Sequence, residues 1–468
     1  MGSTRTARTE LSFLEMRSAR SAPRGLEVNR SILRAAAALM LAGICVKIIA
    51  AFKEVAVASV YGRSDAMDAF LAAMLLPALL VNLISESMNQ ALVPSLIQVR
   101  EREGRNAAQQ LVSSSMLCMC LLLVAISAVA GVAAPEIFSV IASNFSPEKR
   151  ALAIHVFYGL LPIVLLTGIA TTCTAVLNSL DQFALPALAP MMISIATILS
   201  ALLLAGDFGI WALVFATVAG SMAQAVFVAA LMHSRGCRFQ LRWYGRTVAA
   251  REVAGQYWPI LLSGVVASGG LVVDQSMAAM LPAGSVSALA YANRFVSVAM
   301  TLLAGAISTA VLPTFSRMVA RQDWAACRMA IRTWVGWSAM VSIPLTGMLI
   351  AGARTLIRAA LQHGAFGPRD TAVVWPVLTM YALQIPFFVC SRVFYRFLLA
   401  KKRSDLILSC GILNLVLDIG LNLVLMRWLG IAGIALATSL WSASTFFFLG
   451  YFAWKLLPVS EHKDVLIA

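Results

Sequence analysis

The sequence predicts an all-α polytopic membrane protein with about twelve transmembrane helices. These helices form two six-helix lobes that are related by a pseudo-two-fold axis along the membrane normal. Three observations predict this fold: an apolar composition, regularly spaced apolar segments, and an internal repeat. Of the 468 residues, 60% are hydrophobic and only 12% are charged, and the mean hydropathy is +0.85. A soluble domain of this size needs a much more polar surface, so we place the chain in a membrane.

Apolar segments follow one another along the whole chain, and we count twelve. Each has about 20 or more residues, enough to cross a hydrocarbon core of about 30 Å. The segments centre near residues 34–58, 66–97, 107–134, 152–177, 184–205, 208–232, 254–281, 286–316, 326–352, 373–400, 405–428 and 430–456.

The polar segments divide the chain. Residues 1–33 are rich in Arg and Ser, and the apolar segment that follows is long enough to span, so we expect a disordered basic tail and no cleaved signal peptide. An N-lobe over 34–232 is then joined to a C-lobe over 254–457 by an Arg-rich linker over 233–253. A short tail over 458–468 closes the sequence.

The formal charge of +15 arises from Arg and Lys residues in short loops and tails. No soluble domain presents them, so we expect no nucleic-acid partner. Loops on the side of the N-terminus carry about twice as many basic residues as the opposite loops, and the positive-inside rule then makes both termini cytoplasmic. The predicted location is therefore a membrane, which the chain crosses several times.

The two halves repeat. FGIWALVFATV, in the sixth segment, aligns with LGIAGIALATS in the twelfth, which pairs Gly209 with Gly430 and Thr217 with Thr438. The second segment ends in ALVPSL and the eighth in AVLPTF, each before a basic loop. Two halves of six helices that start on the same side are typical of transporters that bind substrate between the halves. Chance similarity between apolar helices is the alternative.

Charged side chains interrupt the first two segments, namely Lys47, Lys53, Glu54, Asp68 and Glu86. A charge that faces lipid costs a few kcal/mol or more, so these residues face a wet cavity or a partner. One interpretation is snorkelling or structural ion pairing. The other is a cationic, water-filled cavity that holds an anion.

Arg294, in the eighth segment, is the corresponding cation of the second half. Together with Lys47 and Lys53 it could clamp a diphosphate from both lobes, because charge-assisted hydrogen bonds to phosphate are strong. In that case Glu54, Asp68 and Glu86 pair with these cations or gate the cavity when it is empty. Two further arginines, Arg392 and Arg396, lie nearer a helix end, where snorkelling is expected.

A second polar set lies in the second half. Asp274 is in the seventh segment, Asp418 in the eleventh, and Asn414 precedes Asp418 by one helical turn. With the hydroxyl of Thr438 these groups offer hard oxygen ligands that suit an alkali cation. A proton relay and hydrogen-bonded helix packing are the alternatives.

Signs of catalysis are missing from the sequence. The four histidines are dispersed, no HExxH, GxSxG or Walker sequence occurs, and the eight cysteines include no CxxC pair. We therefore predict a protein that is not an enzyme and has no cofactor, apart from coupling to Na+ or H+.

The sequence resembles the MurJ/MviN family of lipid II flippases, within the multidrug/oligosaccharidyl-lipid/polysaccharide exporter superfamily. The resemblance extends from about residue 35 to 455. It is carried by KEVAVASVYGRSDAMDAFLAAMLLPALL with ISESMNQALVPSL, by GSVSALAYANRF with GAISTAVLPTFSR, and by HGAFGPRDT with SRVFYRFLLAKKRSD.

The resemblance implies two six-helix lobes around a central cationic cavity that opens alternately to each side. The family's cavity arginines fall on Lys47 and Lys53, and its eighth-helix arginine on Arg294. The family's acids fall on Glu54, Asp68 and Glu86, and the sodium site of some members falls on Asp274, Asn414, Asp418 and Thr438.

The implied function is a flippase that moves a polyprenyl-diphosphate-linked saccharide, such as a lipid II-like peptidoglycan precursor, across the inner membrane. A monomer surrounded by membrane lipids suffices for this. The sequence departs from the family where Val81 and Asn82 replace a basic pair, and many members have two further C-terminal helices after the twelfth. A flippase for exopolysaccharide or O-antigen units is therefore an alternative. A drug/cation antiporter and a scaffold subunit are more distant ones.

Overall fold

The computed structural model describes residues 41–237, 242–245, 269–401 and 403–457. Within two of the helices, the side chains of residues 84–86, 88–90, 306–310 and 312–313 are not described. The predicted tails and most of the predicted linker therefore lie outside the described residues, and the domain boundaries stay predictions. Over the described residues the chain is helical and has no strand.

The first lobe begins with a helix that is described over residues 41–61. It continues with α2 (Asp65–Arg102), α3 (Arg105–Val132), α4 (Ala134–Ile141), α5 (Pro147–Leu160), α6 (Pro162–Ser179), α7 (Ala184–Leu188), α8 (Met191–Leu203), α9 (Ala205–Phe208) and α10 (Trp211–Ser234).

The second lobe begins with a helix that is described over residues 269–278. It continues with α12 (Ser285–Ala320), α13 (Trp324–Leu361), α14 (Pro368–Ala382), α15 (Gln384–Ala400), α16 (Ser404–Leu429) and α17 (Ile431–Lys455).

Ten stretches of the described helices are long and apolar enough to cross a membrane. They coincide with ten of the twelve predicted segments. The helices over 41–61 and 269–278 are the described parts of the other two, the first and the seventh. The prediction of a polytopic all-α fold is thus confirmed.

The backbone repeats between the lobes. The spans that match the fourth and tenth predicted segments, Pro147–Ser179 and Pro368–Ala400, each have 33 residues, and each consists of two helices in succession. Gly209 (φ 54°, ψ −131°) and Gly430 (φ 57°, ψ −133°) adopt the same positive-φ conformation, which favours glycine, just before the last helix of their lobes. The pairing of these two glycines from the sequence therefore matches the structure.

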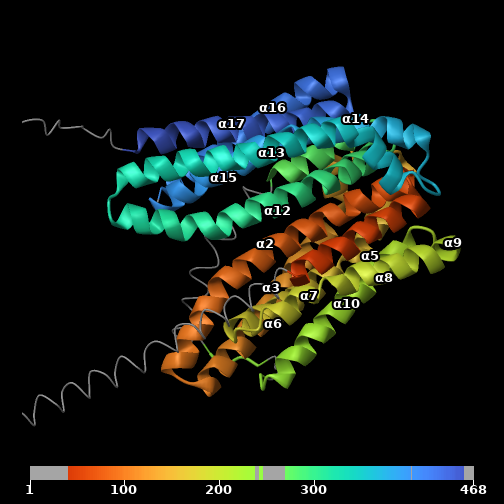
Figure 1. The fold of residues 1–468 in the computed structure, drawn as a ribbon. Coiled ribbons are helices and arrows are strands. Elements are labelled where there is room, and N and C mark those ends of the chain that lie inside the picture. Colours follow the sequence, from red (N-terminus) through yellow and green to blue (C-terminus); the bar gives the residue numbers. More distant parts are fainter. Residues whose placement is uncertain (1–40, 238–241, 246–268, 402, 458–468) are drawn as a thin grey trace, which may run out of the picture.

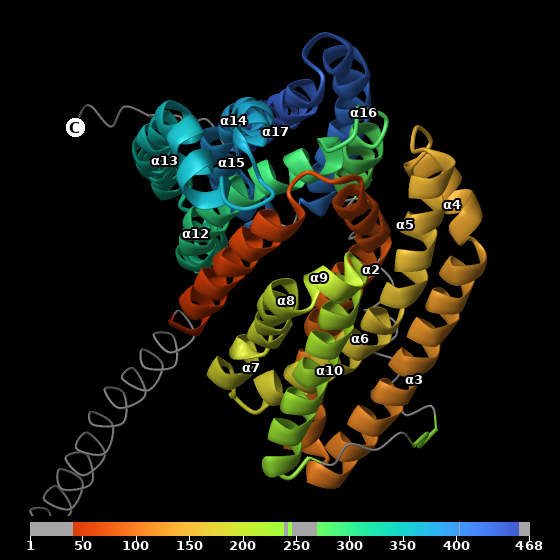
Figure 2. The same ribbon diagram turned by 90° about the vertical axis from the view of Figure 1, so that its right-hand side faces the viewer.

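The two lobes meet at one end and diverge toward the other (Figures 1 and 2). We call these the closed end and the open end. At the closed end one continuous cluster of buried apolar side chains includes residues of both lobes, for example Met67 and Phe138 of the first and Tyr291 and Phe366 of the second. A separate cluster around Leu92 and Leu123 belongs to the first lobe alone. The lobes thus share a core only where they meet.

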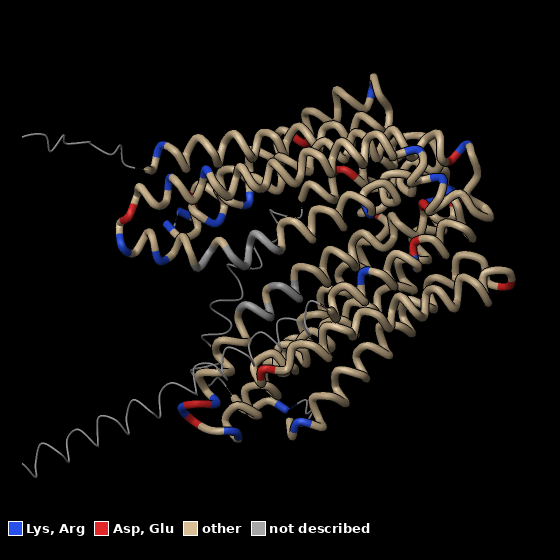
Figure 3. Tube along the Cα trace, viewed as in Figure 1, with Lys and Arg blue, Asp and Glu red and all other residues tan. Residues whose placement is uncertain are grey.

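Charged residues gather mainly at the turns and helix ends, and long stretches of helix between them carry none (Figure 3). This distribution is expected for helices that cross hydrocarbon. The few charges within the helices of the two lobes are the candidates for function.

Candidate functional site

Three charged side chains meet between the lobes. Glu54, on the helix over 41–61, places its Oε1 3.1 Å from Lys53 Nζ and 3.2 Å from Nε of Arg294 on α12. One carboxylate oxygen is therefore shared by a cation from each lobe. The Lys53 and Glu54 side chains are 23% and 19% exposed, whereas that of Arg294 is 57% exposed. The cluster is therefore not sealed off by the surrounding side chains.

Lys47 lies apart from this cluster. Its six-residue separation from Lys53 corresponds to about 9 Å along the helix axis. The residue is exposed and makes no ion pair with any residue that the structure describes. Of the three cations predicted to form a clamp, the structure brings Lys53 and Arg294 together and leaves Lys47 nearer the open end. Glu86 lies on α2, but its side chain is outside the described residues.

Asp68 lies at the closed end, near the start of α2, and only 1% of its surface is exposed. Its Oδ2 accepts a hydrogen bond from Gly284 N–H at 2.6 Å and contacts Lys149 Nζ at 3.0 Å, while its Oδ1 accepts from Ser287 N–H at 2.9 Å. Gly284 precedes α12, where a side-chain cap normally satisfies free N–H groups, but glycine has no side chain. Asp68 therefore caps a helix of the other lobe.

The closed end has further contacts between the lobes. Arg63 Nε donates to the Gly284 carbonyl at 2.9 Å, and its Nη1 lies 3.4 Å from Asp370 Oδ1. The other hydrogen bonds across this seam run from Tyr291 Oη to Gly62 O at 3.0 Å, from Ala365 N to Ser59 O at 2.7 Å, and from Asn144 Nδ2 to Met280 O at 2.8 Å. A backbone group takes part in each of these hydrogen bonds, and Arg63 and Asp370 add an ion pair.

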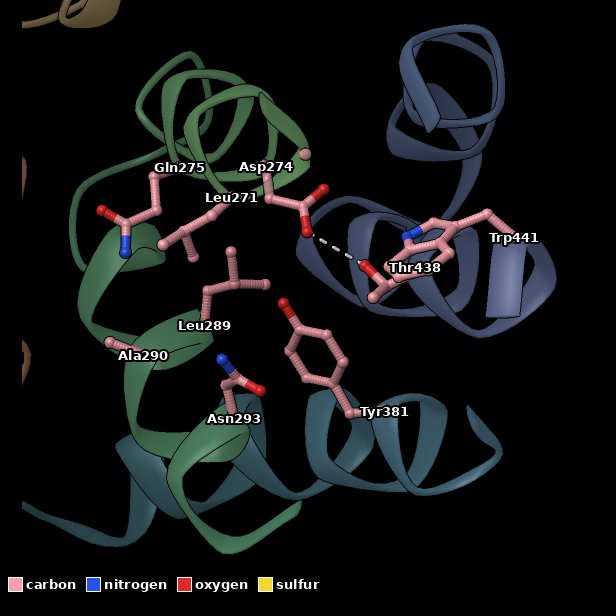
Figure 4. A pocket seen from close by; sticks show the side chains of 10 residues that line it. Leu271, Asp274, Gln275, Leu289, Ala290, Asn293, Tyr381, Thr438 and Trp441 are labelled. Carbon is pink, nitrogen blue, oxygen red and sulfur yellow. Dashed lines mark hydrogen bonds between the residues drawn. The ribbon is translucent and has the colours of Figure 1, made fainter. Parts of the chain in front are cut away.

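A second polar cluster lies inside the second lobe. Asp274, on the helix over 269–278, accepts a hydrogen bond from Asn422 Nδ2 at 2.8 Å. It accepts a second from Thr438 Oγ1 at 3.0 Å (Figure 4). Asn422 Nδ2 also lies 3.3 Å from Asp418 Oδ1. All four residues are buried. The cluster borders a cavity of about 220 Å³, into which Asn293 and Tyr381 also project (Figure 4).

The amide in this cluster comes from Asn422, which is not among the predicted ligands. The predicted Asn414 donates instead to Thr445 Oγ1 at 2.8 Å. Both asparagines lie four residues from Asp418, one on each side, and therefore on the same face of α16. The four-residue spacing from Asp418 therefore indicates Asn422 as much as Asn414.

Two oxygens of the cluster, Asp418 Oδ2 and Asn422 Oδ1, are buried and have no hydrogen-bond partner within the described structure. Buried polar groups without partners are uncommon, and a bound ion is one physical explanation. Two carboxylates, an amide and a hydroxyl form an all-oxygen set, which suits a hard cation. The residues present therefore fit a sodium ion.

Comparisons with known proteins agree with this architecture. The sequence matches the family described as lipid II flippase MurJ over residues 57–467. It is 24% identical to the probable lipid II flippase MurJ of Synechocystis sp., across 88% of this chain and 79% of that protein. It is also 24% identical to the lipid II flippase MurJ of Burkholderia cenocepacia, across 82% of this chain and 76% of that protein.

Solved structures show the same fold. A lipid II flippase MurJ in an inward closed conformation superposes with a TM-score of 0.77 at 24% identity, covering 90% of this chain and 88% of that one. An inward-facing multidrug resistance transporter of the MATE family superposes with a TM-score of 0.74 at 13% identity, covering 88% and 93%. Because the family match extends over most of the sequence, the chain belongs to the MurJ lipid II flippase family.

Proposed function

We propose that the protein moves a polyprenyl-diphosphate-linked saccharide, a lipid II-like peptidoglycan precursor, across the bacterial inner membrane by alternating access. The relatives are named lipid II flippases, and the ten apolar spans suit a multi-pass membrane protein. As a transporter it requires positioned charges rather than groups that make or break bonds. Both lobes of one chain supply those charges, so a monomer suffices.

The observation that carries this proposal is the shared carboxylate oxygen of Glu54. Lys53 from one lobe and Arg294 from the other both contact Glu54 Oε1. A diphosphate offers several such oxygens and more negative charge, so it can take the place of Glu54 between the two cations. An anion bound by both lobes favours the arrangement that brings the cations closest, which couples binding to lobe movement.

The test measures translocation of lipid II in proteoliposomes. Lys53→Met together with Arg294→Met should reduce the rate at least about tenfold, because the diphosphate loses two charge-assisted contacts. Arg294→Lys should retain part of the activity. Arg321→Met, which changes an exposed arginine outside the cluster, is the control. A double variant that transports at the rate of the unchanged protein would refute the clamp.

We also propose that the open end faces the cytoplasm, with both termini on that side. The turns at the open end carry the denser basic charge, with Arg100 and Arg102 at the end of α2 and Arg317 and Arg321 at the end of α12. The positive-inside rule places such turns in the cytoplasm. The structure then corresponds to an inward-facing state in which the periplasmic side is shut.

Finally, we propose that a sodium ion binds among Asp274, Asp418, Asn422 and Thr438. A proton would satisfy only a carboxylate, whereas the unpartnered oxygens belong to a carboxylate and an amide. An amide oxygen is a ligand for a cation but a very poor base, which favours Na+ over H+. The bound ion would supply positive charge to a buried pair of acids and hold three helices of the second lobe together.

The basic character of the cluster between the lobes opposes the alternative of a drug/cation antiporter. Organic cations require an acidic site, whereas Lys53 and Arg294 outnumber the single carboxylate of Glu54. A lipid-linked unit of another polysaccharide has the same diphosphate. A parallel translocation assay with such a unit would distinguish it from lipid II.

A further inference from the structure

Lys149 is buried at the closed end, although it lies at the start of a helix. It occupies the first turn of α5, which follows Ser146 and Pro147, and its side chain is only 9% exposed. Lysine at a helix start is normally solvated, and a positive charge there opposes the helix dipole. A specific partner must therefore hold Lys149 in this position.

The partners are two carboxylates and a ring. Lys149 Nζ lies 2.6 Å from Asp65 Oδ1, 3.0 Å from Asp68 Oδ2, and 4.3 Å from the centre of the Phe145 ring. The two carboxylates differ in their surroundings, because the Asp65 side chain is 64% exposed and that of Asp68 is 2% exposed. The pair with Asp65 is screened by solvent and contributes little. The pair with Asp68 is buried, so its loss would leave an uncompensated buried charge and destabilise the closed end.

The donors to Asp68 fall into two groups. Gly284 N–H and Ser287 N–H belong to the second lobe, whereas Lys149 belongs to the first lobe, as Asp68 does. Helices α2 and α5 pack against each other within that lobe. When the lobes part, Asp68 therefore loses both backbone donors and keeps Lys149.

We propose that Lys149 is the positioning residue of the closed end: it keeps the Asp68 carboxylate charged and aimed at the start of α12, and it remains the counter-ion of Asp68 after the lobes separate. This inference rests on the proposed alternating access. Within the described structure no hydrogen bond or ion pair joins Lys149 to the other lobe or to the clamp residues, so its effect on the seam passes through Asp68.

The direction of the effect follows from solvation. In the closed arrangement Asp68 is buried, and Lys149 is its one direct ion-pair partner within the described structure. Without Lys149, its charge would keep two N–H groups, the dipole of α12 and the more distant Arg63 guanidinium, which is bonded to the Gly284 carbonyl. In the separated arrangement water can solvate the carboxylate. Loss of Lys149 therefore destabilises the closed arrangement more than the separated arrangement. The equilibrium shifts toward separated lobes.

Hydrogen exchange of the full chain in lipid nanodiscs tests this inference, because the amides of Gly284 and Ser287 are themselves the donors to Asp68. Lys149→Met should raise exchange at residues 284–287 by about tenfold or more, while the exchange of α16 and α17 stays unchanged. Lys149→Arg should restore protection, because it keeps the charge. Asp65→Asn is the matched control: it removes the exposed ion pair and should leave this exchange as it was.

A double variant separates a positioning role from a merely structural one. If Lys149 acts through the charge of Asp68, then Lys149→Met should add little to Asp68→Asn, and the two effects will not sum. Additive effects, an unchanged exchange rate in Lys149→Met, or a rise that is uniform over the whole chain would each overturn the inference. The measurement needs no substrate, so a failure of lipid II translocation would count against the proposed function and not against this role of Lys149.

Discussion

Asp68 of the first lobe accepts a hydrogen bond at 2.6 Å from the backbone N–H of Gly284, the residue that precedes α12 in the second lobe. It also accepts from the N–H of Ser287, three residues later. These are the two N–H groups that a capping box within one helix normally satisfies. Here the acceptor lies on the other lobe, so α12 is fully capped only while the lobes are together.

Gly284 is predicted to tolerate no side chain. Its φ is +81°, and a Cβ atom would lie 2.9 Å from the Arg63 carbonyl oxygen. Gly284→Ala should therefore destabilise the closed end by about 1–3 kcal/mol, through both backbone strain and this contact. Faster exchange of the Ser287 amide is the expected readout.

The control for this variant is Gly347→Ala in α13, where a Cβ would meet nothing within 4 Å. That change should stabilise its helix slightly, by about 0.5–1 kcal/mol, and leave the Ser287 amide unaffected. Equal exchange rates in the two variants would mean that the close approach of Gly284 and Arg63 does not hold the lobes together.

Glu54 is predicted to compete with the substrate. Glu54→Gln keeps the shape of the side chain but removes the charge that Lys53 and Arg294 share. Polyprenyl diphosphate should then bind about 5 to 30 times more tightly, because it no longer displaces an anion, while turnover falls because release becomes harder. Titration in detergent gives the affinity.

The matched control is Glu136→Gln, which neutralises an exposed acid of α4. It should leave the affinity for polyprenyl diphosphate unchanged. A Glu54→Gln protein that binds the diphosphate no better than this control would argue that Glu54 is a structural partner and no competitor.

The salt bridge between Arg63 and Asp370 is predicted to be weaker than the other contacts of Arg63. The ion pair is 3.4 Å long and its side chains are 13% and 21% exposed, whereas Arg63 also donates to the Gly284 carbonyl at 2.9 Å. A double-mutant cycle of Arg63→Ala and Asp370→Ala, measured by thermal unfolding, should give a coupling free energy between the two residues of no more than about 1 kcal/mol. Arg63→Ala alone should cost more than that coupling. A coupling of several kcal/mol would instead make the salt bridge the main lock of the seam.

The sequence predicts the membrane helices well, because hydrocarbon thickness sets their length and lipid excludes charge from most of their surface. It also predicts the repeat, since Gly209 and Gly430 need the same backbone conformation, which few other residues adopt. Both signals are local, and so they can be recognised without knowing which helices are neighbours.

The candidate site is predicted less completely, because its contacts depend on how distant segments pack. Lys149 appears in the sequence as an ordinary basic residue of a loop, and only the fold places it beside Asp68. Lys53 and Glu54 point about 100° apart on a helix, yet the long lysine side chain reaches the carboxylate that Arg294 also contacts. Periodicity gives the face of a residue but not its partner on another helix.

Asn422 and Asn414 provide the sharpest test of the cation site. Sodium should raise the unfolding temperature of the protein relative to choline at equal ionic strength, because a bound ion stabilises the folded state. Asn422→Ala should abolish this difference, since Asn422 Oδ1 is a buried oxygen without a partner and its amide contacts both Asp274 and Asp418. Asn414→Ala should retain the difference. Its Oδ1 is also buried without a partner, but the Asn414 amide donates to Thr445, and no hydrogen bond within the described structure joins it to Asp274 or Asp418.

The same comparison distinguishes sodium from a proton. Asp418→Asn should remove the response to sodium, because the site loses a charge and one of its unpartnered oxygens. If stability instead follows pH and is indifferent to sodium, the acids exchange a proton and the all-oxygen site does not bind the ion. If Asn414→Ala removes the sodium response and Asn422→Ala does not, the ion lies one turn of α16 away from the cluster around Asp274.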